Sequence, residues 1–405
     1  MIDQNWTPDD TDTVVSRGSE TPERETLRRY AAAAEQVEAG LCCATTEYDS
    51  ALLAKLPREI IEKDYGCGDP SRHVAEGDTV VDLGSGSGKI CYMLAQKVGR
   101  AGQVIGVDFN DAMLALARKH QDEMTRRIGY ANVRFVKARI QDMALDLERV
   151  DRLLGDCPIR AVEGLGEFEA ECARWRREEP AVADGCADVA VSNCVLNLVK
   201  SGDKQRLFRE IHRVLKPGGR AVISDIVCDE DPTPAIMADP KLWSGCIAGA
   251  FREDCFLEQF EQAGFYGVEI LARQEQPWQV IDGIEFRSIT VRAFKGKEGP
   301  CLERNQAVIY RGPWRFVRDD DGHALQRGQR MAVCGKTFDI MTDPAGPYAK
   351  DIIAVRPRAD VALEAAATFE CRASAIRHPR ETKGPAYNET RPNDEGAGCG
   401  DATCC

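Results

Sequence analysis

Long apolar runs are missing from this chain of 405 residues. No stretch reaches the roughly 18 consecutive apolar residues that a membrane-spanning helix needs. The opening residues, MIDQNWTPDDTDT, are acidic and polar, unlike a signal or transit peptide. We therefore expect a cytoplasmic protein with no membrane partner, in a compartment where thiols stay reduced.

Positive charge is also in short supply. The 53 Lys and Arg residues are outnumbered by 66 Asp and Glu residues, which gives a net charge of −13. Nucleic acids and anionic membranes select surfaces rich in Lys and Arg. The charge balance therefore argues against a nucleic-acid partner and against a DNA-reading metal sensor.

Histidine is scarce, with five residues, and no C-x₂-C pair occurs although the chain has 17 cysteines. This spacing excludes the usual zinc patterns, and a disulfide scaffold does not suit the cytoplasm. Most of the cysteines are therefore expected to be buried thiols that pack as small apolar side chains. The question is which of them have a chemical function.

A strand, a glycine turn and a helix follow one another in VVDLGSGSGKICY, residues 80–92. The strand, 80–83, contains Asp82, and Gly84, Gly86 and Gly88 then alternate with serines. Such a turn lets the backbone approach a nucleoside closely. The spacing G-x-G-x-G lacks the G-K-[ST] of a phosphate-binding P-loop.

A second acid strengthens this interpretation. Asp108 lies twenty residues past Gly88, at the end of the strand predicted over 104–108, where an acid meets a ribose diol in this type of fold. The pattern resembles the S-adenosylmethionine-binding motif of the doubly wound methyltransferases.

Strands alternate with helices along the first three quarters of the chain. This alternation predicts an α/β fold, a doubly wound Rossmann-like class I methyltransferase sheet. The predicted strands are 80–83, 104–108, 133–136, 187–191, 220–226, 268–271 and 286–294; the predicted helices include 23–38, 50–62, 112–125, 204–216 and 252–263.

The domain prediction has five parts. A small β-rich C-terminal domain follows the sheet, because strand-like runs alternate with turn residues after Gly296. A charged helical insertion, 143–186, separates the third strand from the fourth by more than one connection needs. The parts are a disordered segment and helix (1–40), the cofactor-binding domain (41–228), a segment that ends the sheet (229–297), the C-terminal domain (298–371) and a disordered tail with cysteines (372–405).

Three cysteines lie in irregular segments that are expected to meet at one edge of the sheet. Cys194 follows the fourth strand, Cys67 lies between glycines in a turn with an exposed side chain, and Cys246 lies in the excursion after the fifth strand. Ligands of such sheets bind beyond the carboxyl ends of the strands. The alternative is that each is an ordinary core thiol.

The chain resembles the arsenite S-adenosylmethionine methyltransferases. The matching stretches are CATT (43–46), YGCG (65–68), DLGSGSGKICY (82–92), SNCVLNLV (192–199), HRVLKPGG (212–219) and LWSGCIAGAF (242–251). The resemblance implies that Cys67, Cys194 and Cys246 bind As(III) and that Cys43 is a fourth functional cysteine. The 143–186 insertion, with Cys157, Cys172 and Cys186, departs from the family pattern.

Arsenic chemistry agrees with this resemblance. As(III) prefers soft thiolate sulfur, and three thiols can replace the three hydroxyls of arsenous acid. The arsenic lone pair can then take a methyl group without a general base. Each methylation oxidises arsenic, so a disulfide between Cys43 and Cys67, later reduced by glutathione or thioredoxin, would return the electrons.

The expected cofactor site surrounds the glycine loop. Asp108 would hold the ribose, Phe109 would stack or pack on the adenine, and Ile140 and Gln141 would border it. Asp82 would order the loop or bind the amino group, and Lys89 would meet the carboxylate or stay solvated. Tyr65 would lie near the sulfonium or simply pack; the remaining members of the predicted set are Gly84, Ser85, Gly86, Gly88 and Asn193.

Two other functions remain open at this point. A methyltransferase of the same fold for a quinone or another small carbon or nitrogen nucleophile would need an acid or base near the fourth strand. A thiol-rich arsenite binder without enzymatic activity would have no use for S-adenosylmethionine. The preferred interpretation is a monomer whose small-molecule substrates are arsenite and methylarsenite.

Overall fold

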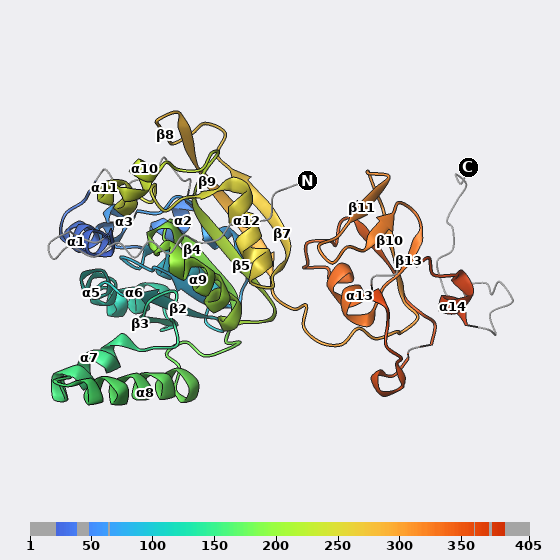
Figure 1. Ribbon diagram of the computed structural model, residues 1–405, viewed down its shortest axis with the longest axis horizontal. Helices are drawn as coiled ribbons and strands as arrows, with labels where there is room; N and C mark the ends of the chain where they lie inside the picture. The colour runs from blue at the N-terminus through green and yellow to red at the C-terminus, as the bar shows by residue number, and fades with distance from the viewer. Residues whose placement is uncertain (1–21, 39–47, 64, 360, 372–374, 385–405) are drawn as a thin grey trace. The chain divides into compact units, whose positions relative to one another are not determined.

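The computed structural model describes residues 22–38, 48–63, 65–359, 361–371 and 375–384. The chain divides into two units, 1–296 and 297–405, which Figure 1 colours from blue to yellow and in orange to red. Among the described residues, none of the helices combines the length and apolar character needed to cross a membrane.

The first unit is built on one mixed sheet with the order β3-β2-β1-β4-β5-β9-β7, to which β6 and β8 are added at β5 and β9. The strands from β3 to β5 are parallel, whereas β7 and β9 are antiparallel to their neighbours. The strands are β1 (Thr79–Leu83), β2 (Gln103–Asp108), β3 (Val133–Lys137), β4 (Ala187–Asn193), β5 (Leu215–Cys228), β6 (Phe251–Arg252), β7 (Tyr266–Arg273), β8 (Gln279–Ile281) and β9 (Ile284–Phe294).

Helices cover both faces of this sheet (Figure 1). Alternate residues of β1 are apolar toward both layers of helices. Val81 and Leu83 pack with α9 (Ser201–Val214) and α12 (Glu253–Gln262), whereas Val80 packs on the opposite face. That second face is covered by helices α2 (Ser50–Leu53), α3 (Arg58–Glu62), α4 (Lys89–Val98), α5 (Asp111–Lys119) and α6 (Gln121–Ile128), of which α2 is only partly buried. A strand that is apolar on both sides is typical of a parallel sheet wound on both faces, as predicted.

Several element boundaries differ from the prediction. The helix expected over 50–62 is divided into α2 and α3, because Pro57 precedes α3 and its ring cannot continue a helix. The helix expected over 112–125 divides at His120 into α5 and α6. Strand β5 begins at Leu215 rather than 220, and a register shift against β4 accommodates the Pro-Gly-Gly stretch.

The insertion between β3 and β4 is helical, in agreement with the prediction, and forms α7 (Leu147–Asp156) and α8 (Val162–Glu178). It has a small core of its own, in which Cys172 and Trp175 pack on Leu145 and Val150. The Arg149 guanidinium lies 4.3 Å from the Trp175 ring centroid. Cys172 is therefore explained by local packing.

Two further segments lie at the carboxyl end of the strands. Helices α10 (Pro234–Ala238) and α11 (Pro240–Ser244) follow β5 and pack in one apolar cluster with Cys67, Cys194 and Cys246. Helix α1 (Pro22–Glu35) packs beside α11 and α5.

The second unit has a three-stranded sheet, β13-β10-β14, and a separate hairpin, β11-β12. Its elements are β10 (Ala307–Tyr310), β11 (Phe316–Arg318), β12 (Ala324–Gln326), β13 (Arg330–Ala332), α13 (Gly335–Thr342), β14 (Ile352–Val355) and α14 (Pro379–Lys383). Disorder was expected from 372, but residues 375–384 fold onto this unit: the buried Arg377 side chain binds Glu303 and Glu381.

Candidate active site

The glycine loop after β1 has a backbone conformation that residues other than glycine rarely adopt. Gly84 and Gly86 have φ angles of 69° and 50°. A Cβ at Gly84 would lie 2.5 Å from a methyl carbon of Val195, whereas one at Gly86 would meet nothing within 4 Å. The N–H groups of Gly84 and Ser85 donate to the carbonyl oxygen of Val107 at 2.8 and 3.0 Å. The loop is thus tied to β2 and leaves open space above Gly86.

A cavity of about 820 Å³, counting its open mouth, adjoins this loop. Gly84, Gly86, Asp108, Phe109, Ile140 and Gln141 line it, so the structure brings together six members of the predicted cofactor set.

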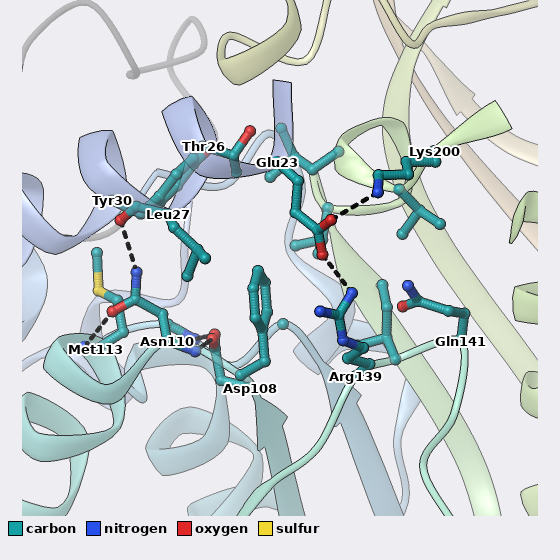
Figure 2. Close-up of a pocket in the computed structure, with 17 residues that line it drawn as sticks. Glu23, Thr26, Leu27, Tyr30, Asp108, Asn110, Met113, Arg139, Gln141 and Lys200 are labelled. Atoms are coloured by element: carbon teal, nitrogen blue, oxygen red, sulfur yellow. Dashed lines mark hydrogen bonds and ion pairs between the residues drawn. The ribbon is translucent and has the colours of Figure 1, made fainter. Parts of the chain in front are cut away.

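Helix α1 forms the opposite wall of this cavity, which the sequence did not predict. Figure 2 shows Glu23, Leu27 and Tyr30 facing Asp108 and Arg139 across the space. The Glu23 carboxylate binds Arg139 and Lys200, the latter at 2.9 Å. Helix α1 carries no sequence motif for such a role, and only its place in the fold reveals it.

Asp108 is the only charged group of the predicted cofactor set at the floor of this cavity. It ends β2, is 9% exposed, and accepts hydrogen bonds from the backbone N–H groups of Gly86 and Asn110, both at 2.9 Å. Burial raises its pKa, and these N–H donors act in the opposite direction. The two bonds hold the carboxylate between the loop and α5, whose first turn Asn110 caps.

A second cavity of about 450 Å³ continues past the glycine loop toward the cysteines. Asp82, Ser85, Tyr65, Asn193 and Cys194 line it. The Ser85 hydroxyl is buried and has no hydrogen-bond partner among the described residues. An unpaired buried hydroxyl beside an acid is what a polar ligand such as the methionine end of the cofactor would satisfy.

Two members of the predicted cofactor set lie outside the described lining of both cavities, and a third has a structural contact. The Lys89 ammonium lies 3.5 Å from the Tyr48 ring centroid, and Lys89 is absent from the described lining of both cavities, as is Gly88, which precedes α4. The Tyr65 hydroxyl donates to the carbonyl oxygen of Ala33 at 3.1 Å. Tyr65 therefore anchors α1 while its side chain borders the second cavity.

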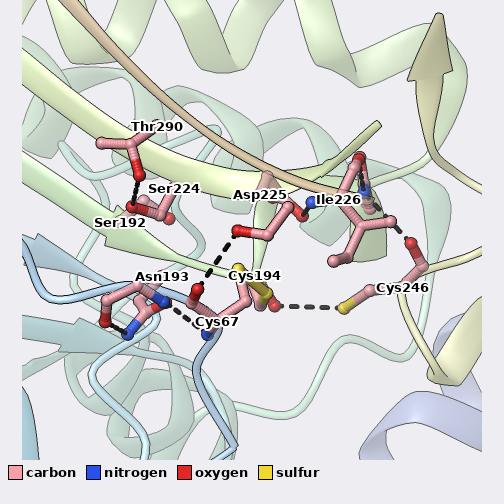
Figure 3. Close-up of a disulfide and its surroundings, with 12 residues drawn as sticks. Cys67, Ser192, Asn193, Cys194, Ser224, Asp225, Ile226, Cys246 and Thr290 are labelled. Carbon is pink, nitrogen blue, oxygen red and sulfur yellow. Dashed lines mark hydrogen bonds between the residues drawn. A yellow bond between two sulfur atoms is a disulfide. The ribbon is translucent and has the colours of Figure 1, made fainter. Parts of the chain in front are cut away.

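The three cysteines lie together at the carboxyl end of the sheet (Figure 3). Cys67 and Cys194 form a disulfide with an S–S distance of 2.12 Å. The Cys246 thiol donates to the Cys194 carbonyl oxygen at 3.1 Å. The exposed fractions of the three residues are 7%, 3% and 4%, so the prediction of an exposed Cys67 is wrong: its turn is covered by the residues around it.

The backbone at two of these cysteines is unusual. Cys194 and Cys246 have φ angles of 60° and 62°, and in the described part of the chain only Asp282 and Asn305 share positive φ among residues other than glycine. This conformation costs a residue with a Cβ of order 1 kcal/mol or more. Such strain is concentrated at functional sites.

Buried polar groups hold the cysteine segments in place. The Asn193 side-chain oxygen accepts from the N–H groups of Cys67 and Gly68 at 2.7 and 2.8 Å, so its amide binds the Cys67 turn. Asn197 donates to the carbonyl oxygens of Ile226 and Cys246 at 2.7 and 3.1 Å. Asn193 was expected to bind cofactor; its hydrogen bonds are to the turn, although it borders the second cavity.

Asp225, on β5, lies beneath the same segments. It accepts from the N–H groups of Leu196 and Ile226, both at 2.8 Å, and is fully buried. Burial raises its pKa to about 6. The neighbouring Lys204 ammonium donates to the carbonyl oxygen of Gly249, and burial lowers the pKa of Lys204 to about 8.

The other cysteines of the prediction lie elsewhere. Cys43 is outside the described residues. Cys157 is exposed at the end of α7, Cys172 is in the core of the insertion, and Cys186 is half-buried just before the amino end of β4, the opposite end from Cys194. None of the last three joins the described cysteine cluster of the first unit.

The sheet, the glycine loop and the acid at the end of β2 define a class I S-adenosylmethionine-dependent methyltransferase. A family model described as a methyltransferase domain matches residues 75–175 and 159–264, and a domain of unknown function matches 297–387. The chain is 35% identical over 307 residues to an arsenite methyltransferase of Aquipseudomonas alcaligenes, covering 72% of this chain and 78% of that protein. It is 30% identical to the arsenite methyltransferase of Homo sapiens, covering 75% and 74% of the two chains.

A solved structure agrees with these relatives. The crystal structure of an arsenic(III) S-adenosylmethionine methyltransferase from Chlamydomonas reinhardtii superposes with a TM-score of 0.51 at 28% identity, covering 79% of this chain and 98% of that one. The chain belongs to the arsenite methyltransferase family. S-adenosylmethionine is accordingly its methyl donor.

Proposed function

We propose that this enzyme transfers methyl groups to trivalent arsenic held by the thiolates of Cys67, Cys194 and Cys246. The observation that carries the proposal is the meeting of these three cysteines, from three separate segments, at the end of the sheet where Cys194 also lines the cavity beside the glycine loop. The names of the related enzymes support arsenic as the substrate.

The arsenic site requires reduced sulfur. A thiol such as glutathione or thioredoxin must first supply two electrons and two protons to open the Cys67–Cys194 disulfide. Arsenous acid can then exchange its three hydroxyls for three thiols, with release of three water molecules and no change in net charge. Soft thiolates are the ligands that such an ion prefers.

We place the cofactor in the two neighbouring cavities, whose linings share Gly84, Gly86 and Val195. Asp108 would accept the ribose hydroxyls, Phe109, Ile140 and Gln141 would border the adenine, and Asp82 and Ser85 would meet the methionine end. When bound, the cofactor supplies an electrophilic methyl group on its sulfonium sulfur. Cys194 lines the cavity at the methionine end, which supports transfer at that point.

The protein's contribution to transfer is positioning and exclusion of water. Three sulfur ligands leave arsenic one lone pair, which is the nucleophile, so no group has to remove a proton. The near-complete burial of all three cysteines keeps water from the reacting atoms. The hydrogen bonds of Asn193 and Asn197 fix the segments that carry Cys67 and Cys246.

A redox step must follow each methylation, because arsenic gives up an electron pair to the new carbon bond. The thiol of a fourth cysteine can lose its proton and attack one of the arsenic-bound sulfurs. A disulfide forms, the sulfur–arsenic bond breaks, and its electron pair stays on arsenic, which returns to the trivalent state. We assign this step to Cys43 and Cys67, followed by reduction with an external thiol. In the structure the disulfide partner of Cys67 is Cys194 instead, so the pairing with Cys43, which lies outside the described residues, rests on the family resemblance.

The test is incubation of the reduced enzyme with arsenite, isotopically labelled S-adenosylmethionine and excess thiol, followed by arsenic speciation. We expect labelled methylarsenicals, and the same products from Cys157→Ser, whose exposed thiol lies in the insertion. Cofactor binding without methylated arsenic would instead favour another small nucleophile, and failure to bind the cofactor would favour a simple arsenite binder.

A further inference from the structure

The second unit contains a cluster of three cysteines that the sequence did not predict. The sulfur atoms of Cys301, Cys334 and Cys371 all lie within 4.8 Å of one another. None of the three is in a disulfide; Cys334 is buried, and Cys301 and Cys371 are half-buried. The cluster is thus compact, and two of its three residues are partly exposed.

Backbone hydrogen bonds bring the three segments together. The N–H of Phe369 donates to the carbonyl oxygen of Cys301 at 2.9 Å, next to a bridge between Leu302 and Thr368. The N–H of Gly335 donates to the carbonyl oxygen of Leu302 at 2.8 Å. The fold itself therefore places the thiols side by side, and the site is organised before any ion arrives.

The start of α13 orients one of the three sulfurs. The Cys334 sulfur accepts a hydrogen bond from the N–H of Thr337 at 3.4 Å and lies 3.2 Å from the Thr337 hydroxyl. The N-terminus of a helix favours negative charge, and thiolates are the form of cysteine that binds soft ions. The arrangement suits a sulfur ligand in its thiolate form.

The number of ligands selects the ion. Among the described residues the cluster contains three thiols and no fourth His, Cys, Asp or Glu. Structural zinc sites in proteins have four such ligands. Trivalent arsenic is satisfied by three sulfurs, because its lone pair occupies the remaining position.

We propose that Cys301, Cys334 and Cys371 form a second binding site for trivalent arsenic, separate from the three cysteines of the first unit. Arsenous acid would exchange its three hydroxyls for the three thiols and release three water molecules, with no redox change. The choice of arsenic over another soft ion rests on the proposed function; the three-thiol site itself rests only on the geometry of the second unit.

The experiment isolates this site in the full-length chain. A background variant carries serine in place of the cysteines of the first site, their neighbours near the N-terminus and the C-terminal tail: Cys42, Cys43, Cys67, Cys194, Cys246, Cys399, Cys404 and Cys405. The reduced protein is incubated with arsenite alone and desalted, and arsenic per chain is measured by mass spectrometry. We expect one arsenic per chain, with three sulfur neighbours by X-ray absorption.

Further substitutions in this background locate the ion. Cys301→Ser and Cys371→Ser, made separately at half-buried positions, should each lower the apparent affinity for arsenite at least tenfold. Cys255→Ser, at a half-buried thiol on α12, is the matched control and should leave it unchanged. Circular dichroism confirms that each variant is folded. Cys334→Ser should act in the same direction, and its burial makes it the less informative variant.

Three results would overturn the proposal. They are a background variant that retains no arsenic, equal arsenic binding in Cys301→Ser, Cys371→Ser and the control, and tighter binding of zinc alone in a four-coordinate site. Because the background variant lacks the first site, its result does not depend on methylation. If the wild-type chain methylated no arsenite while the background bound it, the proposed function would fail and the second site would stand.

Discussion

Replacement of Asp108 by asparagine should weaken S-adenosylmethionine binding by a calculable amount. Each carboxylate oxygen already accepts one backbone N–H, from Gly86 or Asn110, at 2.9 Å. Each keeps a further lone pair that the proposed ribose hydroxyls would use. In Asp108→Asn one oxygen becomes an NH₂ group, which cannot accept a hydrogen bond from either side.

The loss comprises at least one charge-assisted hydrogen bond to the cofactor. Such bonds contribute about 1.5–3 kcal/mol, which corresponds to a roughly 10- to 150-fold rise in the dissociation constant. Isothermal titration calorimetry with S-adenosylmethionine measures it. Arsenite binding by the same variant should be unchanged, since Asp108 is absent from the described lining of the second cavity, which Cys194 borders.

Asp111→Asn is the matched control for this experiment. It is the same chemical change three residues later, on an exposed side chain that pairs with Lys137 at 2.8 Å, and should leave cofactor affinity within about twofold, as surface changes usually do. Burial raises the pKa of Asp108, so its carboxylate takes up a proton at a higher pH than an ordinary aspartate does. The affinity of the wild-type enzyme for S-adenosylmethionine should therefore fall as the pH drops through that higher range. Asp108→Asn should lack this dependence, and cofactor affinity within threefold of wild type in Asp108→Asn would refute the ribose assignment.

Three further predictions concern the residues around the site. Glu23→Gln removes the ion pairs of α1 with Arg139 and Lys200. A partly exposed ion pair stabilises by about 1 kcal/mol, so stopped-flow measurements should show cofactor release up to about fivefold faster. An unchanged release rate would show that α1 does not retain the cofactor. Burial raises the pKa of Asp225 to about 6 in the folded protein, above the value of about 3.9 that is usual for an aspartate in an unfolded chain. The protonated carboxyl therefore stabilises the fold below about pH 4, and this contribution is lost as the pH rises through 6. Thermal unfolding between pH 4 and 7 should show wild type losing of order 3 kcal/mol relative to Asp225→Asn, and a constant difference would contradict the burial argument. Cys157→Ser, Cys172→Ser and Cys186→Ser should keep methylation rates within twofold, and a loss as severe as that of a site cysteine would place the insertion in the active site.

Much of the fold of the first unit was predictable from local sequence patterns. The glycine loop, Asp108 and the apolar strands have short-range signals, and the fold places them as expected. The break at Pro57 had a local signal, since a proline ring cannot continue a helix, and the prediction missed it. The break at His120 and the early start of β5 had no such signal, because they depend on how neighbouring helices and strands pack.

Contacts between distant segments were the part that sequence patterns missed. Helix α1 carries no motif, yet Glu23 and Tyr30 line the cavity beside the glycine loop. Asn197 was visible only as part of a family stretch, and its role depends on the carbonyl oxygen of Cys246 being close. The cluster of Cys301, Cys334 and Cys371 has no recognisable spacing, since backbone pairing between remote segments creates it.

The most direct test of the account compares methylation rates of cysteine variants on two substrates, arsenite and trivalent methylarsenite, with excess thiol. Arsenite has three exchangeable ligands, whereas methylarsenite has two, because its carbon–arsenic bond does not exchange. Cys194 and Cys246, which lie against each other through the 3.1 Å hydrogen bond, are the proposed pair for the second substrate. Cys194→Ser and Cys246→Ser should therefore lose activity on both substrates, while Cys43→Ser and Cys67→Ser should lose it on arsenite and keep substantial activity on methylarsenite. Equal loss on both substrates in all four variants would contradict this division and indicate one indivisible three-sulfur site.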